Sequence, residues 1–225
     1  MERKTPFIDG ERYHLFTRGV EKRNIFSKTE DYERFMILLF LANSEGNVHI
    51  GNLTKKYKGE SFIRMFDEKR GKQLVDIFAY ALMPNHIHII VGEHTPGGIS
   101  KFMLKLMTAY SMYFNARYDR SGPLFTRPFR SRHVDSDEYF RWVFAYVTLN
   151  PLALFQADWQ ENGIRNIPQA SDFMLQHHYS SYYDYFVGAR TESTILNKHK
   201  LPHRFDQDLR FDEVLIALAS VEPGL

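Results

Sequence analysis

Two strand-like stretches, separated only by a proline and an asparagine, constrain the fold of this chain more than any other feature. They are QLVDIFAYALM, residues 73–83, and HIHIIVGE, residues 86–93, and both combine apolar, aromatic and β-branched residues over the length of a strand. Pro84 fixes the backbone for a turn and Asn85 tolerates one, so the strands are expected to pair as an antiparallel hairpin. The chain therefore needs a sheet with at least one antiparallel pair.

Three further elements are expected before the hairpin. RYHLFTRGV, residues 12–20, has the composition of a first strand that ends at Gly19. A helix should follow, with Thr29 as its N-cap and Gly46 as its stop. Residues 53–72 are strongly charged and fit either a helix or an irregular insertion.

After the hairpin, helical spacing returns. Residues 97–122 predict a long amphipathic helix, and residues 124–135 predict a basic loop with a short strand. A second helix should run from Ser136 to about Asn150, before Pro151. The final stretch FDEVLIALASV, residues 211–221, again has helical spacing.

This order of elements favours an α+β fold with a mainly antiparallel central sheet. We expect a catalytic domain over residues 1–160 and a helical C-terminal extension over residues 161–225. No apolar run approaches the roughly 18 residues of a membrane span, and the start of the chain has no signal-peptide pattern. The chain has no cysteine, which excludes thiolate metal sites. A cytoplasmic protein without a membrane partner is therefore expected.

Charge is distributed unevenly along the chain. The formal net charge is only +2. Residues 101–135, however, carry seven basic and two acidic side chains, whereas residues 150–225 carry six basic and ten acidic ones. This polarity fits an anionic partner that meets the middle of the chain, or else a solvated basic face without a partner.

Two histidines interrupt the second strand of the expected hairpin. Side chains at i and i+2 of a strand share a face, so His86 and His88 should lie about 7 Å apart on one side of the sheet. Ile87, Ile89 and Val91 should point the other way, into a core. Two imidazoles on an open face can hold one divalent metal ion. The alternative is a pair of half-exposed histidines that hydrogen-bond to neighbours or water.

The helix over residues 136–150 supplies a candidate nucleophile and a third ligand. Tyr146 and Asn150 lie one helical turn apart on one face. Of the 13 tyrosines, Tyr146 alone has an asparagine or glutamine four residues later. The alternative is structural, with Tyr146 at the edge of the core and Asn150 as the helix end before Pro151.

Four motifs occur in an order that resembles one protein family. They are YHLFTRGVEKRNIF, ALMPNHIHIIV, SGPLFTRPFRS and FAYVTLNPL, and together they span residues 12–155. The chain resembles the His-hydrophobe-His single-tyrosine transposases, and most closely the REP-associated tyrosine transposase branch. The later stretch HHYSSYYDYFVG resembles, more loosely, an extension found in that branch. The resemblance implies a ferredoxin-like or RRM-like sandwich with the histidine pair on a central strand.

The resemblance also implies a chemistry and assigns roles to four residues. Tyr146 would be the nucleophile, and His86, His88 and Asn150 the metal ligands, with Asn150 in the place of an amide ligand that is glutamine in some members. The implied activity is cleavage and joining of single-stranded, hairpin-bearing DNA through a 5′-phosphotyrosine. Family likeness implies Mg²⁺ or Mn²⁺, whereas imidazole ligands by themselves suit Mn²⁺ or Zn²⁺.

Basic side chains are the candidates for DNA contacts. Three arginines between the long helix and the tyrosine helix could contact phosphates as a strand enters. Phe125 and Phe129 interleave with them and fit either stacking on unpaired bases or packing in the core. The complete set of basic candidates is Arg18, Lys22, Arg23, Lys101, Lys105, Arg127, Arg130 and Arg132.

Two other functions fit the same residues. One is a metal-dependent hydrolase in which water attacks the DNA and Tyr146 is structural. The other is a module that binds DNA hairpins without cutting them. Either a monomer or a homodimer is expected, and the acidic tail could block a dimer surface or pack on the domain.

Overall fold

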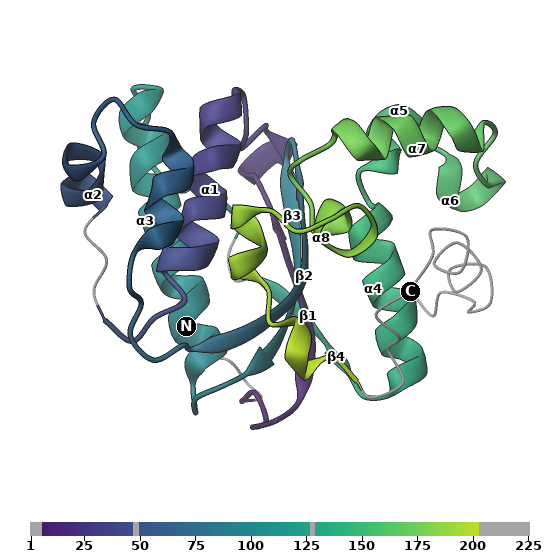
Figure 1. Ribbon diagram of the computed structural model, residues 1–225, viewed down its shortest axis with the longest axis horizontal. Coiled ribbons are helices and arrows are strands. Elements are labelled where there is room, and N and C mark those ends of the chain that lie inside the picture. The colour runs from purple at the N-terminus through teal and green to yellow at the C-terminus, as the bar shows by residue number, and fades with distance from the viewer. Residues whose placement is uncertain (1–5, 47–49, 127–128, 203–225) are drawn as a thin grey trace.

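The computed structural model describes most of the chain, namely residues 6–46, 50–126 and 129–202. The central element is a four-stranded antiparallel sheet in the order β2-β3-β1-β4 (Figure 1). The strands are β1 (Arg12–Arg18), β2 (Val75–Met83), β3 (His86–Glu93) and β4 (Arg130–Val134). Helices pack on both faces of this sheet, so the predicted α+β fold is confirmed.

The predicted hairpin is present as β2 and β3. Met83 pairs with His86, which leaves Pro84 and Asn85 as a two-residue turn. The carbonyl of Pro84 accepts hydrogen bonds from the N–H groups of Ile25 and Phe26, so the turn is tied to the segment that follows β1.

One face of the sheet is covered by α1 (Thr29–Leu41) and α3 (Gly98–Arg117), with α2 (Ile50–Lys56) farther out (Figure 1). The predicted long helix is α3, and its apolar stripe is fully buried in the core: Ile99, Phe102, Met103, Leu106 and Tyr110. The charged stretch that fitted a helix or an irregular insertion contains most of α2 and a short 3-10 helix, Phe62–Asp67.

Both predicted ends of α1 are wrong, for local reasons. Lys28 is the N-cap and Thr29 the first helical residue, because the Asp31 carboxylate accepts the N–H groups of Ser27 and Lys28. The helix ends at Leu41 instead of near Gly46. Just beyond it, the buried side chain of Asn43 hydrogen-bonds to the backbone of residues 74 and 75, which holds the chain out of helical geometry.

The other face is covered by α4 (Asp137–Leu149), the predicted tyrosine helix (Figure 1). Ser136 caps it by accepting the N–H of Tyr139, and Asn150 is the C-cap. Its buried stripe of Phe140, Val143, Phe144 and Val147 forms a cluster with apolar residues of β2 and β3. This packing sets the height and rotation of α4 above β3.

The chain beyond α4 folds into short helices. They are α5 (Leu152–Phe155), α6 (Trp159–Asn162), α7 (Ile167–Gln176), α8 (Tyr182–Phe186) and two 3-10 turns, Thr191–Ile195 and Lys198–Lys200. The helix expected at residues 211–221 lies outside the described residues, and the division at residue 160 stays a prediction.

This extension covers the outer edge of β2. The N–H of Leu82 donates to the carbonyl of Tyr179, and the N–H groups of Ser181 and Asn197 donate to β2 carbonyls. An exposed strand edge is a site for pairing with another chain, and these bonds occupy it. In the part of the chain that the structure describes, no helix is long and apolar enough to cross a membrane.

Candidate active site

The alternation of β3 places the two histidines on the face that α4 covers. Ile87, Ile89 and Val91 are fully buried in the opposite core, as expected. The rings of His86 and His88 lie on the α4 side with their centroids 5.1 Å apart. β3 therefore has a packing face, formed by Ile87, Ile89 and Val91, and a chemical face, which carries His86 and His88.

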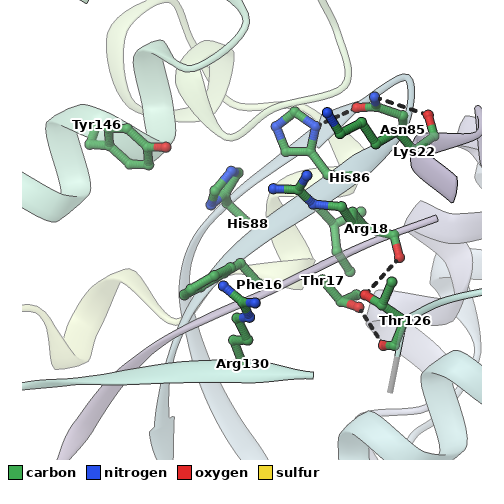
Figure 2. Close-up of a pocket in the computed structure, with 11 residues that line it drawn as sticks. Phe16, Thr17, Arg18, Lys22, Asn85, His86, His88, Thr126, Arg130 and Tyr146 are labelled. Carbon is green, nitrogen blue, oxygen red and sulfur yellow. Dashed lines mark hydrogen bonds between the residues drawn. The ribbon is translucent and has the colours of Figure 1, made fainter. Parts of the chain in front are cut away.

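Tyr146 reaches this histidine pair from α4. Its ring centroid lies 5.4 Å from that of His88 and 6.0 Å from that of His14 on β1. Trp142, one turn earlier, stacks on Tyr146 at 5.4 Å with planes only 12° apart, which restricts the orientation of the phenol. Figure 2 shows the hydroxyl of Tyr146 directed toward the histidines.

Asn150 links the tyrosine to the histidines. Its side chain is buried, and its amide influences the pKa of both His86 and Tyr146. An amide has an oxygen that accepts and an NH₂ group that donates, so one side chain can serve both partners. The structure therefore brings together the four residues that the resemblance singled out: His86, His88, Tyr146 and Asn150.

His86, His88 and Tyr146 border a cavity of about 800 Å³ at the end of the sheet where β3 begins (Figure 2). Five basic or imidazole side chains contribute to its wall, and none of the described residues contributes a carboxylate to it. The lining residues are Phe16, Thr17, Arg18, Lys22, Asn85, His86, Ile87, His88, Thr126, Arg130 and Tyr146.

Hydrogen bonds at Nδ1 determine which nitrogen of each histidine is available. The Nδ1 atom of His86 lies 2.6 Å from Oδ1 of Asn85, whose NH₂ group donates to the carbonyl of Lys22. Since an amide oxygen only accepts, His86 carries its proton on Nδ1 and keeps a free lone pair on Nε2. His88 has its Nδ1 atom 2.9 Å from Nε2 of His14, and donation to His14 would free its Nε2 in the same way.

Burial keeps both imidazoles neutral. Desolvation holds the pKa of His88 well below its usual value. The positive charges that His14 and His86 carry when protonated lower this pKa further. Desolvation and then Arg18 lower the pKa of His86. Burial also lowers the pKa of His14 to about 4. At neutral pH each ring therefore offers a lone pair without first losing a proton.

Tyr146 is in the opposite situation. Burial raises the pKa of its phenol, and the nearby Asn150 amide only partly offsets this increase. The hydroxyl is therefore protonated at neutral pH, and nucleophilic attack requires a nearby positive charge or a base.

The donor chemistry fits a divalent metal ion. Two neutral imidazole nitrogens and an amide lie together, and such ligands leave the charge of the ion undiminished for a substrate. Among the described residues, no group of three or more His, Cys, Asp or Glu side chains could hold a metal. The Asn150 amide, which lies near enough to His86 to influence its pKa, could supply a third ligand to an ion between His86 and His88.

Comparison with known proteins identifies the family of this chain. Residues 10–150 match the model of the "Transposase IS200 like" family. The chain belongs to the IS200-like transposase family. Among solved structures it is similar to a REP-associated tyrosine transposase bound to a REP hairpin, with 11% identity and a TM-score of 0.44 over 82% of this chain and 84% of that chain. The search of curated proteins found no match.

Three of the basic candidates line the cavity of this transposase: Arg18, Lys22 and Arg130. Lys22 is held there by an unusual turn, in which it and Glu21 adopt left-handed φ values of 58° and 56°. Residues other than glycine rarely adopt this backbone conformation, so contacts with the surrounding protein maintain the turn. Gly19, just before it, leaves no room for a Cβ atom against the carbonyl of Arg23.

The other basic candidates lie elsewhere. Arg132 on β4 lies opposite His14, and Arg23 forms an ion pair with Glu21. Lys101 and Lys105 are on α3, which packs on the opposite face of the sheet, and Lys105 donates to backbone carbonyls of residues 44 and 46. Arg127 lies outside the described residues.

The two phenylalanines of the basic segment do not face the cavity. Phe125 is buried in the core, and Phe129 stacks at 6.4 Å on Phe7. Sequence reasoning missed His14 and Phe16, which lie on the α4 side of β1. Their alternation with the buried Tyr13 and Leu15 is visible in YHLF, but nothing in the sequence pairs β1 with β3.

Proposed function

We propose that this transposase cleaves and rejoins single-stranded DNA bearing a hairpin, with Tyr146 as a nucleophile that forms a 5′-phosphotyrosine. The observation that carries the proposal is the convergence of Tyr146, His86 and His88 on one cavity with a basic wall, with the Asn150 amide beside Tyr146 and His86. Family membership supports a DNA substrate. The ordered motifs, through their resemblance to the REP-associated branch, support the hairpin and the polarity of cleavage.

In this mechanism Nε2 of His86 and of His88, with the Asn150 amide, would hold a divalent ion. Such an ion neutralises charge on a non-bridging phosphate oxygen and favours loss of the phenolic proton. Mn²⁺ and Mg²⁺ are the proposed ions.

Tyr146 performs the bond exchange. Its oxygen attacks phosphorus as the bond to the 3′ oxygen breaks, the phenolic proton leaves, and the departing oxygen gains a proton to become a 3′-hydroxyl. The Asn150 amide lowers the pKa of Tyr146, and its NH₂ group would stabilise the phenolate. The new ester retains the energy of the broken bond, so a second 3′-hydroxyl can attack it and join the strands.

A denaturing gel distinguishes this mechanism from its rivals. The substrate is labelled hairpin DNA from repeats that flank the gene, with Mn²⁺ or with EDTA. We expect a covalent protein–DNA band with Mn²⁺ for the wild type and for Tyr139→Phe, a matched control on the same helix. Tyr146→Phe should give neither band nor cleavage while its hairpin affinity stays within a few-fold.

Two outcomes would reject the proposal. Cleavage without a covalent band, unchanged in Tyr146→Phe, would favour the hydrolase in which water attacks. Tight hairpin binding without cleavage in any variant would favour the binding module.

A further inference from the structure

Phe16 is an aromatic side chain that the apolar core does not use. It is half-buried on the α4 side of β1 and belongs to none of the three hydrophobic clusters among the described residues. Its neighbours are imidazoles: the ring lies 6.0 Å from that of His88 at an interplanar angle of 25° and 5.2 Å from that of His14. The ring contributes to the cavity wall (Figure 2).

The sheet register places Phe16 between a proposed metal ligand and a cation. Phe16 pairs with His88 of β3 on one side and with Arg130 of β4 on the other. Paired residues of neighbouring strands point to the same face and are about 5 Å apart. The row across the sheet is thus imidazole, aromatic ring, guanidinium.

The cations around Phe16 are available to a ligand. Arg18 and Arg130 are exposed and line the cavity, and neither side chain has an ion-pair partner within the described ranges. Since none of the described residues contributes a carboxylate to the cavity wall, the surroundings of Phe16 favour an anionic ligand with an apolar, flat part.

A single DNA strand has this composition, with phosphates that alternate with flat bases. We propose that Phe16 is a stacking platform for one unpaired base beside the scissile phosphate, and that Arg130 and Arg18 bind the phosphates that flank this base. The inference rests on the proposed function for the position of the scissile phosphate. A phenylalanine offers no hydrogen bond, so the site selects for an unpaired base and not for its identity.

The test compares two strands that differ only in their bases. The probes are an octamer of dT and an octamer of abasic sites with the same number of phosphates. Affinities are measured by fluorescence anisotropy in EDTA, with Tyr146→Phe as the parent protein, so that neither metal nor cleavage contributes.

We expect Phe16→Leu to weaken binding of the dT octamer roughly five- to twenty-fold and to leave the abasic octamer within two-fold, because stacking on one aromatic side chain contributes about this much per base. Phe16→Trp, which keeps a flat ring, should retain the preference for dT. Phe129→Leu is the matched control, since this ring stacks on Phe7, and should leave both affinities unchanged.

The inference is wrong if Phe16→Leu weakens both octamers equally, or neither, while its thermal midpoint shows a folded protein. Loss of the dT preference in Phe16→Trp would also contradict it. Covalent adduct formation by the otherwise unmodified protein is a separate readout. A dT preference that depends on Phe16 in a protein that forms no adduct would support the base site and reject the tyrosine mechanism.

Discussion

The two faces of the sheet differ in how completely they are filled. Under α1 and α3, the inward side chains Leu15, Ile87, Ile89 and Val91 are all fully buried. On the α4 face, helix packing covers Ile90 and its neighbours but leaves the end with His86 beside the cavity. One strand, β3, supplies both environments through its alternation. Stability and chemistry should therefore respond separately to changes at neighbouring positions.

The largest effects are expected from two substitutions on opposite faces of β3, one of which should affect activity and the other stability. His86→Ala should lower DNA cleavage by about 100-fold or more, because it removes a proposed metal ligand, with little change in the free energy of unfolding. Ile89→Ala should lower that free energy by about 2–5 kcal/mol through loss of buried apolar volume. Urea unfolding and initial cleavage rates measure the two effects. If folded Ile89→Ala lost activity as fully as His86→Ala, the two faces would not be separable.

The next effect concerns the contact between His14 and His88. Nε2 of His14, by accepting a hydrogen bond from Nδ1–H of His88, would keep Nε2 of His88 free, so His14→Phe should weaken Mn²⁺ binding by about 10- to 100-fold. His14→Gln, which retains an acceptor, should bind within a few-fold of the wild type. Nitrogen NMR of the metal-free protein checks the cause directly. A His88 ring protonated on Nε2 would contradict it.

Acid should destabilise the chemical face. His14 has a pKa of about 4 in the folded protein, against about 6.5 when unfolded, so between these values the unfolded chain binds more protons. Stability from this group is complete above pH 6.5 and decreases as the pH falls. Between pH 6.5 and 5 the expected loss is about 2 kcal/mol, measured by urea unfolding in EDTA. His14→Gln should lose less over the same range, and an equal loss would show that other groups cause the acid sensitivity.

The smallest expected effect is on the salt dependence of DNA binding, which should change when a cation is removed beside the cavity but not when one is removed on α3. Arg130→Gln should reduce the salt dependence of single-strand binding by about one phosphate contact, a change of about 0.7 in the slope of log affinity against log salt. Lys101→Gln, on α3, should leave that slope unchanged. Equal changes in both variants would place DNA on both faces of the sheet.

Local sequence patterns were enough to predict the parts of the site that lie within one element. The turn at Pro84 and Asn85, the alternation of His86 and His88 with Ile87, and the buried stripe of α4 follow from short-range rules. The roles of Tyr146 and Asn150 came from the family resemblance. The structure adds that the Asn150 amide lies near enough to Tyr146 to lower its pKa.

Features that depend on pairing between distant segments could not be predicted. The register that sets Phe16 beside His88, and the contact of His14 with His88, join residues more than 70 positions apart. The end of α1 likewise depends on Asn43, which bonds to backbone 31 and 32 positions away. In each case, a hydrogen bond or strand pairing between distant residues determines the local structure, and the local sequence does not reveal it.

The most direct test of the tyrosine mechanism is the chemical identity of the protein–DNA bond. Wild-type protein, incubated with hairpin DNA and Mn²⁺, is digested with nuclease and protease and mapped by mass spectrometry. The mechanism predicts a nucleotide attached through its 5′ phosphate to the peptide containing Tyr146, and to no other tyrosine. An adduct on a different residue, or cleaved DNA with a free 5′ phosphate and no modified peptide, would contradict it.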